Sequence, residues 1–136
     1  HHDITYPNKI ILKLVGKIIP QYKKENPDVN LTMDPWSLEN FKFIQFKPGN
    51  YYDAFHSEQS YTQPRVFAVL VYLSDHNCGT EFTNGKIVKS VKGRSLIFPA
   101  YWTHTHKGQP CPDNKIRYIL TTHAKFNKRE KHELES

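Results

Sequence analysis

The sequence predicts one mainly β domain, a sandwich or barrel, with a single helix packed on its sheet. The 136 residues are enough for one hydrophobic core. From residue 41 onward, short aromatic and β-branched runs alternate with turn residues, whereas one stretch near the N-terminus has helical periodicity. Aromatic residues form 13% of the chain and supply the apolar faces that a disordered chain lacks.

Residues 8–26 form the predicted helix. Its apolar residues recur at spacings of three and four and make one stripe, with Lys and Glu elsewhere. Asn8 is a suitable first residue and Pro27 ends the pattern. Pro20 predicts a break or kink near the last turn. The apolar stripe consists of Ile10, Ile11, Leu14, Val15, Ile18, Ile19 and Tyr22.

The predicted β-core covers about residues 41–124. Turn signals such as Asn84-Gly85 separate its short strands, and several short strands at this spacing favour a sandwich or barrel. Residues 125–136 are mostly charged and are predicted to be a solvated helix or tail. No repeat or linker divides the chain, so residues 1–136 are predicted to be one domain. The expected strands are 41–46, 51–55, 66–73, 80–82, 87–91, 95–98 and 117–123.

Charge and cysteine content narrow the class of protein. The net charge of +6 is compatible with an acidic partner but is too modest to identify one. No apolar run approaches the roughly 18 residues of a membrane span, and no secretory pattern is present, so we expect no membrane contact. Cys78 and Cys111 form neither a disulfide framework nor a CxxC pair, so we expect reduced thiols and a cytoplasmic location. The start His1-His2, without Met, is typical of a tag remnant or a trimmed fragment.

Histidines are the first candidates for chemistry. His56 and Glu58 are two residues apart near the end of a strand-like run, and alternation along a strand puts both on one face. Such a pair can give two ligands to one metal ion, and His104 and His106 are candidates for the third. Two imidazoles and a carboxylate are the ligands of non-haem iron(II) oxygenases. Taken alone, an HxE pair is more often a surface histidine beside an unrelated glutamate.

The order of the motifs resembles that of the iron(II)- and 2-oxoglutarate-dependent oxygenases, specifically the prolyl 4-hydroxylase-like group. The similarity covers about residues 43–122, more than half of the chain. Each motif is modest, but all occur in the family's order and at family-like spacing. The similar segments are 46–52 before the first ligand, His56-Ser57-Glu58 at the HxD/E position, Tyr72-Leu73-Ser74, 77–82 (like GGxTEF), 92–99 (like kGrlliFP), 102–110 around the distal histidine, and 117–121.

This resemblance implies a double-stranded β-helix (a jelly-roll, cupin-like fold) with the helix packed on its sheet, and Fe(II) held by His56, Glu58 and one distal histidine. We expect His106 rather than His104 for two reasons. His106 is followed by Pro110, which matches the family's HxxxP motif. The number of residues between His106 and Arg117 is also closer to the family's spacing than the number between His104 and Arg117. Glu58 stands where aspartate is commoner.

The same resemblance assigns a co-substrate pocket. Arg117 would bind the far carboxylate of 2-oxoglutarate, because a guanidinium can hold a carboxylate through two hydrogen bonds. The Tyr72 hydroxyl would add another hydrogen bond, and Thr121, on the same strand face as Arg117, a further one. Phe46 stands where relatives often have tyrosine, so one hydrogen bond to the co-substrate would be absent. The candidates for the substrate cleft are Arg65, Trp102 and His104.

The implied activity is hydroxylation of a C–H bond by O2, with release of succinate and CO2 and with ascorbate as a candidate reductant. By family analogy, the substrate is a prolyl residue of a peptide or protein. One alternative keeps the chemistry and changes the substrate to nucleic acid or a small molecule, although no cluster of basic and aromatic residues flanks the metal motif. Another is a non-catalytic metal- or sugar-binding jelly-roll, which would not require Arg117 and Tyr72. The sequence predicts no particular oligomeric state.

Overall fold

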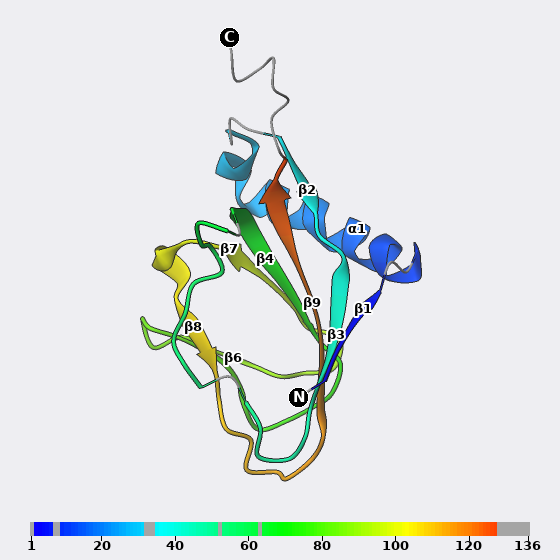
Figure 1. The fold of residues 1–136 in the computed structure, drawn as a ribbon, viewed down its shortest axis with the longest axis vertical. Helices are drawn as coiled ribbons and strands as arrows, with labels where there is room; N and C mark the ends of the chain where they lie inside the picture. The colour runs from blue at the N-terminus through cyan, green and yellow to red at the C-terminus, as the bar shows by residue number, and fades with distance from the viewer. Residues whose placement is uncertain (1, 7–8, 32–34, 52, 63, 128–136) are drawn as a thin grey trace.

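The computed structural model describes residues 2–6, 9–31, 35–51, 53–62 and 64–127. Two antiparallel sheets make up the domain (Figure 1). The large sheet has the order β1-β3-β9-β4-β7, with β2 also paired to β9, and the small sheet has the order β6-β5-β8. The elements are β1 (His2–Tyr6), α1 (Lys9–Glu25), the 3-10 helix η1 (Pro27–Leu31), β2 (Trp36–Leu38), β3 (Phe41–Phe46), β4 (Arg65–Tyr72), β5 (Gly79–Phe82), β6 (Ile87–Lys89), β7 (Ser95–Pro99), the 3-10 helix η2 (Trp102–His104), β8 (His106–Gly108) and β9 (Arg117–Phe126).

Alternation along the central strands gives the large sheet two different faces. On one face, Leu120 and Ala124 of β9 and Phe67 of β4 form the main core with Ile19 and Tyr22 of α1. On the other face, the intervening residues of β9 line a pocket that lies between the two sheets. The predicted mainly β double-stranded β-helix with one helix packed on its sheet is therefore confirmed.

Three short segments differ from the predicted strands. Residues 51–55 contain no strand among their described positions; the chain joins β8 only at His56, through an isolated bridge. Strands β2 and β8 were not predicted, because three residues are too few to show an alternating pattern. Their pairing partners, β9 and β5, lie far away in the sequence. His2, expected to belong to a tag remnant, lies in β1 and pairs with Gln45 of β3.

Helix α1 continues through Pro20, so the predicted break does not end it. A proline inside a helix removes one backbone hydrogen bond, but Ile19 and Tyr22 on either side are packed in the core, and such packing supplies most helical stability. At the other end of the chain, β9 extends to Phe126, so the charged segment expected from residue 125 begins later. Residues 128–136 of that segment lie outside the described residues.

Cys78 and Cys111 form a disulfide, with their Cα atoms 5.0 Å apart. The prediction of reduced thiols is therefore wrong, because the fold brings together two cysteines that are 33 residues apart in the sequence. The cytoplasmic expectation loses the support of reduced cysteines, since disulfides are typical of oxidising compartments. Within the described ranges, no helix has both the length and the apolar character needed to cross a membrane.

Candidate active site

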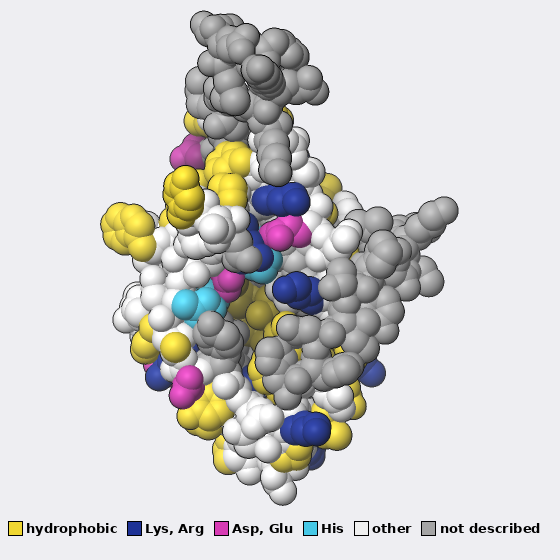
Figure 2. All heavy atoms as spheres, viewed as in Figure 1, with side chains coloured by type: hydrophobic (Ala, Val, Ile, Leu, Met, Phe, Trp, Pro, Cys, Tyr) yellow, Lys and Arg dark blue, Asp and Glu magenta, His cyan; other side chains and the backbone are white. Residues whose placement is uncertain are grey.

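A pocket of about 450 Å³ lies between the two sheets. Strands β3, β4 and β9 line one side of it, and β5, β8 and residues 56–60 line the other. Figure 2 shows a hollow in the molecular surface that contains histidine and acidic side chains and has Lys and Arg side chains at its edge. The volume is typical of a small-molecule site.

Backbone pairing places His56 directly opposite His106. Each backbone N–H donates to the other residue's carbonyl at 2.9 Å, and the two ring centroids are 4.5 Å apart. β8 begins at His106 and pairs it with Phe82 of β5. The rings of Phe82 and Phe98 also pack against the His106 imidazole. The sheet therefore fixes the positions of both histidines.

Glu58 meets both imidazoles through one carboxylate oxygen. Its Oε1 lies 2.8 Å from Nε2 of His106 and 3.3 Å from Nε2 of His56, and the ligand atoms of this group all lie within 4.8 Å of one another. The Nδ1 atoms face away: that of His56 is 2.8 Å from the Ala54 carbonyl, and that of His106 is 2.9 Å from the His104 carbonyl. A carbonyl can only accept, so each Nδ1–H donates to it, and each Nε2, which faces Glu58, is the atom placed to bind a metal once its proton is released.

The electrostatics of this cluster suit a cation. Burial alone would raise the pKa of Glu58, but hydrogen bonds with His106, His123 and His56 hold that pKa far below its usual range. Burial would likewise lower the pKa of His56, but hydrogen bonds with Glu58 and the Ala54 carbonyl raise it overall. The carboxylate is therefore ionised at neutral pH, and the donor set fits a divalent metal of the iron type.

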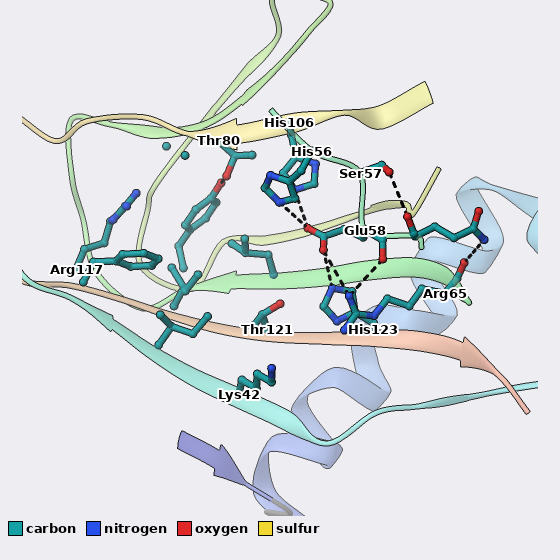
Figure 3. Close-up of a pocket in the computed structure, with 18 of the residues that line it drawn as sticks. Lys42, His56, Ser57, Glu58, Arg65, Thr80, His106, Arg117, Thr121 and His123 are labelled. Carbon is teal, nitrogen blue, oxygen red and sulfur yellow. Dashed lines mark hydrogen bonds and ion pairs between the residues drawn. The ribbon is translucent and has the colours of Figure 1, made fainter. Parts of the chain in front are cut away.

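The opposite end of the pocket contains a buried guanidinium (Figure 3). Arg117 is only 5% exposed, and its guanidinium carbon lies 4.6 Å from the centre of the Phe46 ring. Its Nη1 donates to Sγ of Cys78 at 3.6 Å, while its Nε has no hydrogen-bond partner and no described carboxylate is within ion-pair distance. Burial lowers the pKa of Arg117. A buried cation without an ion-pair partner among the described residues is suited to a ligand carboxylate.

The two predicted hydroxyl residues of the co-substrate pocket also line it. The Tyr72 hydroxyl shares a hydrogen bond of 2.7 Å with Oγ1 of Thr80 and donates to the Val88 carbonyl at 3.2 Å. Burial raises the pKa of Tyr72, so its proton is retained. Thr121 lines the pocket opposite Lys42 of β3. Sequence reasoning did not identify Thr80 and Lys42 as pocket residues.

The structure separates the two distal histidines. His106 belongs to the group with His56 and Glu58 that could hold a metal ion, whereas His104 ends η2 and lines a different pocket beside α1, where its ring stands edge-on to Phe82. Trp102, a candidate for the substrate cleft, is 81% exposed and does not line the active-site pocket. Arg65 does line it and pairs with Glu39, with Nε 2.8 Å from a carboxylate oxygen.

His123 was given no role by sequence reasoning, yet it contacts the cluster. Its Nε2 lies 3.2 Å from Oε2 of Glu58. Alternation along β9 could have identified it, because it lies on the same face as Arg117 and Thr121. Glu39, on the far side of His123, had no sequence signal, because a long-range pairing brings it there.

Comparisons with solved structures find prolyl hydroxylases as structural neighbours. The viral collagen prolyl hydroxylase of Paramecium bursaria Chlorella virus-1, in its 2-oxoglutarate complex, superposes with a TM-score of 0.73 at 18% identity, over 93% of this chain and 80% of that one. The Pseudomonas putida prolyl-4-hydroxylase gives 0.54 at 20% identity, over 68% of this chain and 56% of that one. A Trichoplax adhaerens prolyl hydroxylase in complex with a hypoxia inducible factor peptide fragment gives a TM-score of 0.55 at 19% identity, over 66% of this chain and 44% of that one.

These neighbours define the class of fold. The chain has the double-stranded β-helix of the prolyl 4-hydroxylase-like oxygenases. No protein-family profile and no curated protein matches its sequence.

Proposed function

We propose that this chain is an Fe(II)- and 2-oxoglutarate-dependent hydroxylase. One observation carries the proposal: a single pocket combines the ligand atoms of His56, Glu58 and His106 at one end with the buried guanidinium of Arg117 at the other. A site that only binds metal would need the first group but not the second. Burying a cation without an acidic partner costs stability, so its retention indicates a ligand that carries a carboxylate.

Each pocket residue has a defined part in this proposal. His56, Glu58 and His106 would hold Fe(II), which when bound supplies the oxidising chemistry that inserts one atom of O2 into a substrate C–H bond while 2-oxoglutarate becomes succinate and CO2. Arg117 would bind the far carboxylate of the co-substrate with two N–H donors. The hydroxyls of Tyr72 and Thr121 would orient that carboxylate. The apolar side chains of the pocket would restrict water.

The proposed substrate is a prolyl residue of a peptide or protein. The viral neighbour is a collagen prolyl hydroxylase, and the Trichoplax neighbour is in complex with a peptide fragment. These facts describe those proteins and support the analogy for this one. A mass increase of one oxygen atom on proline in a peptide library, dependent on 2-oxoglutarate, would test the substrate class separately from the chemistry.

The decisive experiment is an anaerobic titration of the Fe(II)-loaded protein with 2-oxoglutarate, following the visible charge-transfer band of chelation. We expect a band in the parent and none in His56→Ala or His106→Ala. Arg117→Ala should weaken co-substrate affinity by about tenfold or more, since hydrogen bonds to charged groups contribute roughly 1.5–3 kcal/mol each. His104→Ala is the matched histidine control and should keep the band.

Two results would contradict parts of this proposal. Normal iron binding without a band would rule out the oxygenase and favour a metal-binding module. A band that survives His106→Ala but is lost in His104→Ala would keep the function and change the ligand.

A further inference from the structure

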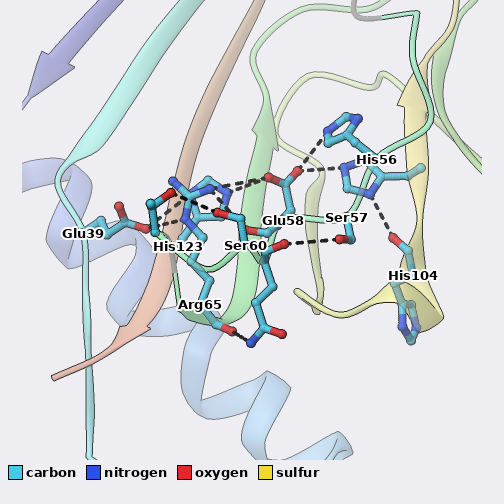
Figure 4. A network of polar contacts seen from close by, with 11 residues as sticks. Glu39, His56, Ser57, Glu58, Ser60, Arg65, His104 and His123 are labelled. Atoms are coloured by element: carbon cyan, nitrogen blue, oxygen red, sulfur yellow. Dashed lines mark hydrogen bonds and ion pairs between the residues drawn. The ribbon is translucent and has the colours of Figure 1, made fainter. Parts of the chain in front are cut away.

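The two carboxylate oxygens of Glu58 face different partners. Oε1 faces the imidazoles of His56 and His106, whereas Oε2 lies 3.2 Å from Nε2 of His123 and 3.8 Å from Nη1 of Arg65 (Figure 4). An ionised carboxylate accepts hydrogen bonds only, so Nε2–H of His123 is the donor to Oε2. The two oxygens are therefore not equivalent in this site.

The partners of Oε2 are themselves held in place. Oε2 of Glu39 lies 2.8 Å from Nε of Arg65 and 3.6 Å from Nδ1 of His123. The backbone N–H of Glu39 donates to the His123 carbonyl at 2.8 Å, so the β-sheet fixes this acid beside the imidazole. The side chains of Arg65 and His123 are only 10% and 13% exposed. This arrangement limits the freedom of His123.

Holding Oε2 matters because a carboxylate can bind a metal through one oxygen or through both. Binding through both would use a coordination position that an oxygenase needs for its co-substrate or O2. Glu58 also has one more rotatable bond than the aspartate that is commoner at this position, so its carboxylate needs more support. Of the two donors to Oε2, His123 is the nearer, and Arg65 also forms a closer ion pair with Glu39.

We propose that His123 is a positioning residue that holds Oε2 of Glu58 through Nε2–H, so that Glu58 binds the metal through Oε1 alone. The inference rests on the metal site of the proposed function and adds a third histidine to its machinery. Hydrogen bonds to metal-binding carboxylates commonly change metal affinity by about 10–100-fold.

The test uses Co(II) as a spectroscopic probe, added to the metal-free protein and to three variants at position 123. His123→Gln places an amide nitrogen near the position of Nε2, facing Glu58. His123→Asn places one near Nδ1, facing Glu39. His123→Ala removes both donors. The thermal midpoint of each metal-free protein is measured in parallel, because it reports a purely structural role.

We expect His123→Ala and His123→Asn to weaken Co(II) affinity by about 10–100-fold and to change the visible Co(II) spectrum. His123→Gln should restore most of the affinity and the parent spectrum. Because Gln and Asn are both small amides, their comparison tests the inference even if the alanine variant does not fold.

The outcomes separate this inference from the proposed function. A parent protein that binds no Co(II) would overturn both. A parent that binds Co(II), with His123→Ala binding equally well, would overturn the role of His123 alone. Rescue by Asn rather than Gln, or losses of affinity that follow only the loss of thermal stability, would also overturn it.

Discussion

Arg117 is a buried charge whose desolvation costs stability and which, in the proposed function, would bind a ligand carboxylate. Its guanidinium is desolvated, its Nε has no hydrogen-bond partner, and no described acid lies within ion-pair distance of it. We expect Arg117→Met to raise the free energy of unfolding of the ligand-free protein by about 1 kcal/mol, as removal of strained functional groups often does. We also expect 2-oxoglutarate to stabilise the parent thermally in the presence of Mn(II) and the same variant to lose this stabilisation.

Arg94→Met is the control for this prediction, because Arg94 is exposed and its side chain hydrogen-bonds only to the Lys89 carbonyl among the described residues. Arg94→Met should change neither the free energy of unfolding nor the thermal response to 2-oxoglutarate appreciably. Urea denaturation gives the free energy of unfolding, and a thermal-shift series gives the response to 2-oxoglutarate. A less stable Arg117→Met protein that still responds to 2-oxoglutarate would contradict the assignment of Arg117.

The residues that sequence analysis grouped and that lie together in the structure were those linked by local spacing or motif order. His56 and Glu58 are two residues apart, and the proline after His106 distinguished it from His104, which the structure places in another pocket. His123 and Glu39 were missed. Their contact depends on the pairing of separate strands, and the sequence shows neither that pairing nor which acid it brings beside the imidazole.

Strand β5 can approach β6 closely only because Gly79 has no side chain. A Cβ at this position would collide with the Val88 carbonyl and crowd Lys89. Gly79 also holds the start of the β8–β9 connection, since it exchanges hydrogen bonds with Gln109. We expect Gly79→Ala to lower the free energy of unfolding by about 1–3 kcal/mol, the usual cost of overpacking.

The matched control for Gly79 lies in α1, where the fold tolerates a methyl group. Nothing lies within 4 Å of a Cβ added at Gly16, and the position is exposed. Gly16→Ala should raise the free energy of unfolding by roughly 0.5–1 kcal/mol, because alanine is the better helix former. Urea denaturation of both variants checks the pair; a stable Gly79→Ala protein would contradict the packing described for β5.

The stability of the domain as a whole should depend on pH through Asp113. Asp113 lies in the β8–β9 connection, where its carboxylate is 2.8 Å from Nδ1 of the buried His76 and accepts the Lys115 backbone N–H. Burial would raise the pKa of Asp113, but hydrogen bonds with Lys115 and His76 hold it below the value of 3.8 of a free aspartate. The folded state therefore binds this proton less readily than the unfolded state.

The sign of the pH effect follows from that difference. The contribution of Asp113 to stability is present above the unfolded pKa and is lost as the pH falls through the lower folded pKa. We expect the parent to be more stable than Asp113→Asn near neutral pH, with the difference shrinking at acid pH. Urea denaturation of both proteins over a pH series measures it; a difference that does not vary with pH would contradict the prediction.

The overall architecture was predictable because it depends on periodicity within each segment. The amphipathic stripe of α1 and the apolar runs of β3, β4 and β9 each carried their own signal. Strand β8 and the disulfide between Cys78 and Cys111 carried none, since each exists only through a partner distant in the sequence. The interior of the fold was therefore easier to predict than the connections that close the pocket.

The alternation along β9 also bears on how this protein can evolve. Positions 119, 121 and 123 face the pocket, while positions 120 and 124 belong to the core against α1. Substitutions at Thr121 or His123 would change the polar lining of the pocket and leave the core against α1 in place, whereas Ile119 also packs in a smaller buried cluster with Phe46 and Tyr72. Selection could then change the polar lining of the pocket in single steps, each starting from a stable parent.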